Sequence, residues 1–250
     1  MTPKQEWYET FFSGLYGRVL GSDMHEGRAP EEAGLAKRLL KLRKGQRVLD
    51  CPCGLGRMAR GLAGLGLDVT GTDLAATYVQ RARRRAASDG LRIRFVRCDM
   101  RELPFDGEFD AVVNWFTSFG YFDDDGNLAA ARAALRALKP GGKFLIETMN
   151  KSSLLARFNP GRRETVINGV TVVNRARWDA KGSRVRDPSK LSSGSKTQRT
   201  TISIRVYNAA DMRSLLREAG FQDVKLFGRP PLGRFTKHSR RMIAVATRPE

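Results

Sequence analysis

From residue 47 onward, short apolar runs alternate with longer segments whose apolar residues recur at helical spacing. This alternation is typical of a buried parallel sheet whose strands are joined by helices, so the chain is expected to have an α/β fold. Five short strands are predicted, at 48–49, 69–71, 93–96, 111–113 and 144–146. Helices are predicted between them, at 57–65, 74–87 and 127–138.

The segments on either side of these five strands also carry clear patterns. Two helices are predicted ahead of the sheet, at 7–20 and 31–42. The first has an aromatic stripe at helical spacing, which we interpret as packing and which consists of Trp7, Phe11, Phe12 and Tyr16. Near the other end, Asn208 is expected to cap a helix over 209–219. Two more strands are predicted after it, at 224–227 and 242–246.

The rhythm differs between the fifth strand and that last helix. Residues 164–178 and 200–207 alternate polar with β-branched residues, which indicates half-exposed antiparallel strands. The stretch between them, 181–198, is rich in Ser, Lys and Gly, and a flexible basic loop is expected there. The chain is therefore divided into an N-terminal helical segment over 1–45, a main domain over 46–150 and 206–250, and a small antiparallel β insertion over 151–205.

The loop after the first strand has the composition of a ligand-binding turn. Asp50 ends the strand, Gly54 and Gly56 follow, and a helix begins at Arg57. Glycines let the backbone approach a ligand closely, and the free N–H groups at a helix N-terminus attract an anionic group. The loop is therefore a candidate binding site at the carboxyl end of the sheet.

Two cofactor classes are compatible with this loop. Gly54-x-Gly56-x-x-Ala59 fits the dinucleotide pattern, with Asp73 about where a ribose-binding acid would fall, so an NAD(P)-dependent oxidoreductase is one alternative. The carboxylate of Asp50 would repel a pyrophosphate but attract the ammonium group of an amino-acid ligand. The charge therefore favours a zwitterionic ligand.

Several motifs in order extend this interpretation to the whole sheet. The region 48–149 resembles the class I S-adenosylmethionine-dependent methyltransferases, whose D-x-G-x-G-x-G loop corresponds to 50–56, with Pro52 in place of the first glycine. The other matching segments are Asp73, 98–100, 110–115, 138–144 and 215–221. The resemblance implies a Rossmann-like, seven-stranded, mostly parallel sheet with helices on both faces.

The resemblance also implies the cofactor and its contacts. S-adenosyl-L-methionine would be the methyl donor and S-adenosyl-L-homocysteine the product, with no metal expected. In the family, the acid after the second strand holds the ribose hydroxyls, and the acid after the third strand and its neighbour address the adenine. The residues carried over as cofactor contacts are Asp50, Cys51, Pro52, Cys53, Gly54, Gly56, Asp73, Leu74, Asp99, Met100, Asn114 and Trp115.

The acceptor side is less sharply marked. The aromatic segment 114–122 follows the fourth strand, at the edge where ligands of open α/β sheets bind. In the family, N-terminal helices and the segment after the fifth strand close over the substrate. The substrate-binding candidates are Tyr16, Phe119, Tyr121, Asn150, Arg205 and Tyr207. Tyr121 and Arg205 are the catalytic candidates, and no general base is assigned.

Charge bears on the acceptor and on possible partners. The chain has a formal net charge of +19, and residues 157–205 hold 12 basic against 3 acidic residues. Such an excess favours an anionic small metabolite, or RNA docked on the insertion. Because Phe158 and Trp178 are the only aromatic residues of that segment, stacking surfaces for bases are sparse, and a small-molecule acceptor is preferred.

Cysteine usage and the apolar segments suggest a compartment. Cys51, Cys53 and Cys98 are too few for a disulfide framework and lack a neighbouring histidine for a metal pattern. No apolar run approaches the roughly 20 residues that a membrane-spanning helix requires, and no secretion signal is recognisable. A cytoplasmic protein without a membrane partner is expected, and its oligomeric state is left open.

Overall fold

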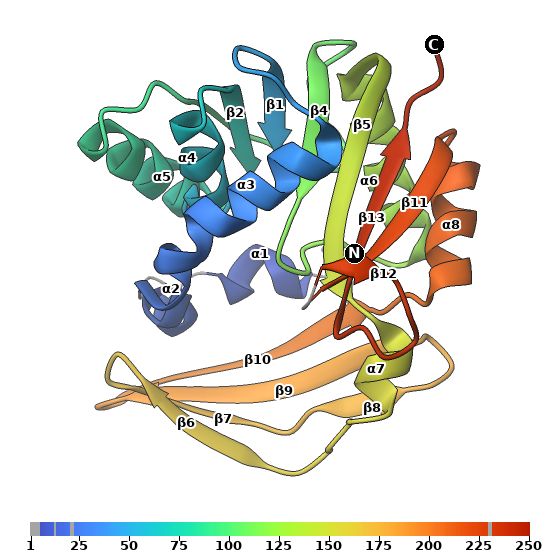
Figure 1. Cartoon of the computed structure of the whole chain (residues 1–250). Helices are drawn as coiled ribbons and strands as arrows, with labels where there is room; N and C mark the ends of the chain where they lie inside the picture. The colour runs from blue at the N-terminus through green and yellow to red at the C-terminus, as the bar shows by residue number, and fades with distance from the viewer. Residues whose placement is uncertain (1–5, 13, 21–22, 230–231) are drawn as a thin grey trace, which may run out of the picture.

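The computed structural model describes residues 6–12, 14–20, 23–229 and 232–250, which form a large and a small β-sheet with helices around the large one (Figure 1). The large sheet has the strand order β12-β11-β13-β5-β4-β1-β2-β3. Its strands are β1 (Arg47–Asp50), β2 (Asp68–Asp73), β3 (Arg94–Arg97), β4 (Phe109–Asn114), β5 (Leu138–Met149), β11 (Gln222–Arg229), β12 (Gly233–Arg234) and β13 (Arg241–Thr247).

The pairing within this sheet confirms the expected fold class. Strands β3, β2, β1, β4 and β5 run parallel, whereas β13 lies antiparallel between β5 and β11. These are the seven predicted strands, and the two-residue β12 extends the edge beyond β11. The expectation of a short fifth strand was wrong, because β5 spans 12 residues and pairs along much of its length with β4 and β13.

Helices cover both faces of the large sheet. Four of these helices are α4 (Arg57–Gly64), α5 (Ala76–Ser88), α6 (Asp124–Ala137) and α8 (Ala209–Glu218). Together with α3 (Ala29–Leu40), α4 and α5 bury their apolar residues against one face, while α6 and α8 pack against the other. Helix α6 begins earlier than predicted because the Asp123 carboxylate accepts a hydrogen bond from Gly126 N–H, and Asn208 caps α8 as expected.

The N-terminal helix predicted over 7–20 is divided in two. The structure has α1 (Trp7–Phe11) and α2 (Gly14–Leu20), followed by the 3₁₀ helix η1 (Asp23–Arg28). Gly14, the first residue of α2, has φ +63°, a left-handed conformation that interrupts a continuous right-handed helix. In Figure 1, α1 and α2 lie between the carboxyl ends of β1 and β2 and the small sheet.

The small sheet contains the antiparallel strands expected within 164–178 and 200–207, and a hairpin replaces the flexible loop expected over 181–198. Its strands are β6 (Arg163–Ile167), β7 (Val170–Asn174), β8 (Arg177–Asp179), β9 (Arg184–Ser193) and β10 (Lys196–Arg205). β9 and β10 form a hairpin with continuous pairing from Arg184 with Arg205 to Ser193 with Lys196. The prediction of a loop was wrong because the backbone ladder and the buried side chain of Leu191 stabilise a hairpin whose side chains are mostly polar. The short helix α7 (Lys151–Leu155) connects β5 to this sheet.

Helix α2 packs on the inner face of the small sheet. Leu15 and Val19 form an apolar cluster with Val170 and Leu191, the last two fully buried. The side-chain oxygen of Gln198 accepts a hydrogen bond of 2.8 Å from Leu15 N–H. Among the described helices, none is both long and apolar enough to cross a membrane.

The Leu191 cluster leads to a first prediction about stability. Leu191→Ala is expected to lower the free energy of unfolding by about 2–4 kcal/mol, because it removes a fully buried side chain and leaves a cavity. Urea denaturation followed by circular dichroism measures this change. Val166→Ala on the same sheet is the control and should change it by less than about 0.5 kcal/mol, since Val166 is exposed. Equal effects of the two substitutions would contradict the packing described for α2.

Candidate active site

A cavity of about 360 Å³ opens at the carboxyl ends of β1, β2 and β4. Its walls come from the loops after these strands and after β3, from the start of α5, from α1 and α2, and from β10. Ligands of open α/β sheets bind at this edge because the loops there diverge. The residues predicted from the glycine loop and from the ends of the strands therefore converge on one hollow.

The two glycines of the loop after β1 have different roles. Gly54 has φ +54° and open space where a Cβ would stand, so its backbone is free to approach a ligand. Gly56 has φ +79°, and a Cβ there would lie 3.1 Å from the Cβ of Ala82 in α5. Gly54 lines the cavity, whereas Gly56 allows α5 to pack closely against the loop.

Asp50 places a buried carboxyl group beneath this loop. The side chain is almost completely buried, and its Oδ2 atom has no hydrogen-bond partner among the described residues. Burial raises the pKa of Asp50 to about 8, although the nearby Arg57 guanidinium opposes the shift. A carboxyl group with an unsatisfied oxygen at a cavity wall would be stabilised in its ionised form by a cationic ligand group.

Asp73 ends β2 and is held by the backbone around it. Its Oδ2 accepts from Gly54 N–H and its Oδ1 from Ala75 N–H, both at 2.9 Å. Burial raises the pKa of Asp73, and these backbone hydrogen bonds oppose that shift. Each carboxylate oxygen keeps a further acceptor position, so the group can receive two hydroxyl donors from a ligand in the cavity.

Most of the remaining predicted cofactor residues line the cavity, and one lies behind its wall. Leu74, Asp99, Met100 and Trp115 line the cavity, as do the three residues 51–53. Asp99 also pairs with the Arg101 guanidinium, at 2.7 Å between Oδ2 and Nη2. Asn114 does not line the cavity: it is buried behind the wall, and its amide nitrogen lies 3.8 Å from the sulfur of Met100.

Aromatic side chains close the other side of the cavity. The ring of Phe12 lies 5.9 Å from the rings of both Tyr78 and Tyr121, and Trp7 makes an edge contact of 4.8 Å with Tyr121. Tyr16 also lines this side, and it contacts Phe12 with ring centroids 6.2 Å apart. The aromatic stripe interpreted as packing thus forms part of the cavity wall as well.

Several wall residues escaped the sequence analysis. They include Trp7, Phe12, Tyr78, Ile202 and Ile204. The aromatic stripe was the signal for the first two, whereas the two isoleucines lie in the strand expected over 200–207, where nothing marked them as wall residues. The position of the two isoleucines at the cavity depends on the packing of β10 against α1, which no local pattern reveals.

Four of the predicted substrate residues do not reach the cavity. Phe119 and Tyr207 are buried against each other in the core, with ring centroids 5.9 Å apart. Asn150 caps α7 and donates to the carbonyl of Ser239 at 2.7 Å. Arg205 pairs with Asp124 at 3.0 Å. These groups serve packing, backbone hydrogen bonding and an ion pair, so the structure gives no support to their assignment to the substrate or to Arg205 as a catalytic candidate.

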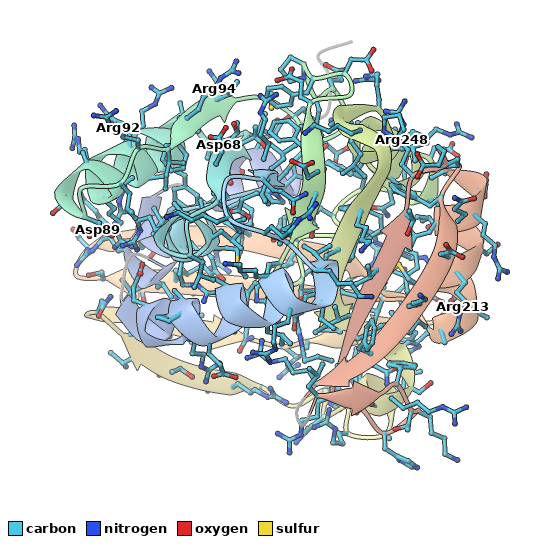
Figure 2. The ribbon with its side chains drawn as sticks, turned by 45° about the horizontal axis from the view of Figure 1, so that its top comes forward. Asp68, Asp89, Arg92, Arg94, Arg213 and Arg248 are labelled. Atoms are coloured by element: carbon cyan, nitrogen blue, oxygen red, sulfur yellow. The ribbon has the colours of Figure 1, made fainter. Side chains whose placement is uncertain are left out.

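The arginines on the cavity wall are already paired with carboxylates. Arg57 contacts Glu32 at 2.5 Å, and Arg85 contacts Glu26 at 2.6 Å, while Glu26 also binds Arg60. The remaining charged wall residues are acidic. The arginine excess lies elsewhere: Arg92 and Arg94, for example, project outward from the edge of the large sheet (Figure 2). The cavity therefore offers no surplus positive charge to an anionic acceptor.

The cysteines at the cavity are free thiols. Burial raises the pKa of the Cys51 and Cys53 thiols well above the usual value, which keeps them protonated and weakly nucleophilic. Within residues 6–12, 14–20, 23–229 and 232–250, no cluster of three or more His, Cys, Asp or Glu side chains has the arrangement of a metal site. The expectation that the reaction uses no metal stays a prediction.

Comparison with known sequences identifies the region around the glycine loop. Residues 48–142 match the family described as a methyltransferase domain. The chain is also 38% identical over 103 residues to demethylmenaquinone methyltransferase of Clavibacter sepedonicus, an alignment that covers 41% of this chain and 40% of that protein. The chain thus spans about two fifths of the length of this curated relative.

Comparison with solved structures extends over nearly the whole chain. The CcbJ methyltransferase of Streptomyces caelestis has a TM-score of 0.79 at 19% identity, covering 99% of this chain and 100% of that one. The sugar N-methyltransferase KedS8 of Streptoalloteichus sp. ATCC 53650 has a TM-score of 0.72 at 20% identity, covering 100% and 99%. At these identities the likeness is one of fold, and the aligned region spans nearly the whole chain.

Proposed function

We propose that the protein is an S-adenosylmethionine-dependent methyltransferase that methylates an uncharged, largely apolar small molecule, and the match of residues 48–142 to a methyltransferase domain supports the reaction. The observation that carries the proposal is the convergence of Asp50, Gly54 and Asp73 on a cavity whose opposite wall is aromatic. The match to a methyltransferase domain implies S-adenosylmethionine as the methyl donor. The aromatic wall is the basis for the proposal about the acceptor.

The first wall of the cavity, formed by Asp50, Gly54 and Asp73, fits the methyl donor. The unpartnered oxygen of Asp50 suits the ammonium group of its amino-acid part, and the carboxylate of Asp73 suits the two ribose hydroxyls. Gly54 leaves room for the ligand between them. When bound, S-adenosylmethionine supplies a methyl group on a positively charged sulfur, which is the electrophile of the reaction.

The character of the second wall supports an uncharged, apolar acceptor. Rings of Trp7, Phe12 and Tyr121 and the side chains of Ile202 and Ile204 form this wall. Apolar ligands gain by leaving water for such a surface, and flat ligands also gain from ring contacts. The anionic acceptor suggested by the net charge is not supported, because the wall arginines are already paired with carboxylates.

The chain's contribution to catalysis would be positioning and the exclusion of water. Holding two reactants in line removes several kcal/mol from a barrier of this kind, roughly 7–11 in the best intramolecular cases. Burial raises the pKa of Tyr121 well above its usual value and that of Tyr16 to about 12, so neither phenol is suited to act as a base at neutral pH. Tyr121 would instead orient the acceptor.

The alternatives are not favoured by any feature of the cavity. A nicotinamide cofactor would place a pyrophosphate next to Asp50, whose buried carboxyl group suits a cation better. For RNA, the exposed side chains of Lys190 and Arg199 on the small sheet would have to guide a nucleotide to a cavity narrowed by aromatic rings. Methylation of a small molecule needs neither.

Transfer of a radiolabelled methyl group tests the proposal. The purified protein, labelled S-adenosylmethionine and an extract of the native host are combined, and RNA, protein and small molecules are then separated. Label is expected in an uncharged, solvent-extractable small molecule and should be absent with Asp73→Ala. Label in RNA would overturn the acceptor class. A failure to bind S-adenosylhomocysteine, measured by calorimetry, would overturn the activity itself.

A further inference from the structure

The turn that follows β4 has an unusual backbone at the edge of the cavity. Phe116 has φ +65° and Thr117 has φ +62°, so two consecutive residues with side chains adopt the left-handed conformation. This conformation is unfavourable for residues other than glycine, and it persists only where surrounding contacts enforce it. Both residues line the cavity.

A buried carboxylate holds this turn from below. Glu147, in the middle of β5, is 3% exposed. Its Oε2 accepts from Phe116 N–H at 3.1 Å, and its backbone carbonyl accepts from Thr117 N–H at 3.0 Å. Arg241 on β13 binds both carboxylate oxygens, at 2.6 and 2.7 Å, and also donates to the hydroxyl of Thr117. The carboxylate is thereby fixed in position.

A second buried carboxylate fixes the residue before the turn. The indole N–H of Trp115 donates to Glu32 at 3.1 Å, and Glu32 is itself bound by Arg57 and by Arg229. The turn is therefore held on one side by α3 and on the other by β5 and β13. An exposed surface loop does not require two buried ion pairs, so this arrangement points to a side chain whose position matters.

The side chain so held is that of Phe116. Its surface is 47% exposed although it also lines the cavity, so the ring lies at the rim between the interior and solvent. It rests near the guanidinium of Arg57, 5.9 Å from the ring centre. Since a half-exposed ring gains little from burial, core packing does not explain why a strained backbone is kept here.

We propose that Phe116 is a specificity-determining residue at the rim of the acceptor site, and that Glu147 and Arg241 form the pair that positions it. The ring would cover an apolar acceptor and exclude water from the neighbouring methyl donor. An acceptor without an apolar face would lose this contact. The inference rests on the proposed function and specifies which residue recognises the acceptor.

Phe116→Gly tests the role of the ring without straining the fold. Glycine accepts φ +65°, so the midpoint of thermal unfolding should not fall, whereas the ring contact is lost. Label transfer into the small-molecule fraction is measured against dilutions of the extract. The half-saturating amount of extract should rise about tenfold, while the dissociation constant for S-adenosylhomocysteine changes by less than threefold. Lys41→Gly, at an exposed left-handed position ending α3, is the matched control and should change neither.

Glu147→Gln tests the positioning pair. Gln keeps an acceptor for Phe116 N–H but loses the charge that binds Arg241, so half-saturation should again rise, by about three- to tenfold. In the Phe116→Gly background the same substitution should have no further effect on transfer, because the pair acts through the ring. A purely structural role would instead lower activity equally in both backgrounds.

The outcomes separate the two hypotheses. If the wild-type protein binds S-adenosylhomocysteine and transfers label, but Phe116→Gly behaves like Lys41→Gly, the role of the rim is wrong and the proposed function stands. If the wild-type protein does not bind S-adenosylhomocysteine at all, the proposed function itself is wrong. If Glu147→Gln does not fold, the comparison of Phe116→Gly with Lys41→Gly still decides the question for the ring.

Discussion

Asp73→Asn is expected to weaken S-adenosylmethionine binding by at least 100-fold. The carboxylate holds Gly54 N–H and Ala75 N–H with separate oxygens, and an amide has one oxygen only, so one of these contacts is lost. The negative charge available to a ligand hydroxyl is lost as well. Hydrogen bonds to a charged group contribute about 1.5–3 kcal/mol each, so two of them account for a change of this size.

Isothermal calorimetry with S-adenosylmethionine measures this effect directly. Asp68→Asn is the matched control, because Asp68 begins the same strand that Asp73 ends and is exposed (Figure 2). The control should keep the wild-type dissociation constant within a factor of two. If Asp73→Asn remains folded by circular dichroism and binds within threefold of the wild type, the assignment of the first wall to the donor is wrong.

The convergence of the strand ends on one side of the cavity could be predicted because it depends on local sequence. Asp50, Gly54 and Asp73 each lie at the end of a parallel strand, and such ends meet at one edge whatever the details of packing. The separate roles of Gly54 and Gly56 could not be predicted, since they depend on how closely α5 approaches the loop.

The acceptor side could not be predicted to the same extent. It is assembled from segments that are distant in sequence, such as Phe12 in the N-terminal segment, Tyr78 in α5 and Ile202 in β10. The hairpin of β9 and β10 was missed because its side chains are mostly polar, and a composition rule treats such residues as unable to pack. Arg205 and Tyr207 were near the right strand, but their side chains point into the supporting structure.

The pH dependence of stability offers a test of Asp50 without any ligand. Burial raises the pKa of Asp50 from 3.8 to about 8 in the folded chain, so between these values the folded state binds more protons than the unfolded state. For this group, the free energy of unfolding should therefore fall as pH rises from about 4 to about 8. Asp50→Asn should be less sensitive to pH over this interval, which urea denaturation at pH 5 and pH 8 can measure.

The same carboxyl group makes cofactor affinity depend on pH in the opposite direction. The ammonium group of S-adenosylmethionine would bind the ionised form of Asp50, whose population falls from about one half at pH 8 to about one hundredth at pH 6. The dissociation constant should therefore rise by up to about 50-fold between pH 8 and pH 6. Asp50→Asn should bind weakly at pH 8 and show little change down to pH 6. Calorimetry at pH 7 in two buffers of different ionisation enthalpy should detect proton release on binding to the wild type, and an equal pH profile for both proteins would rule out Asp50 as the ammonium partner.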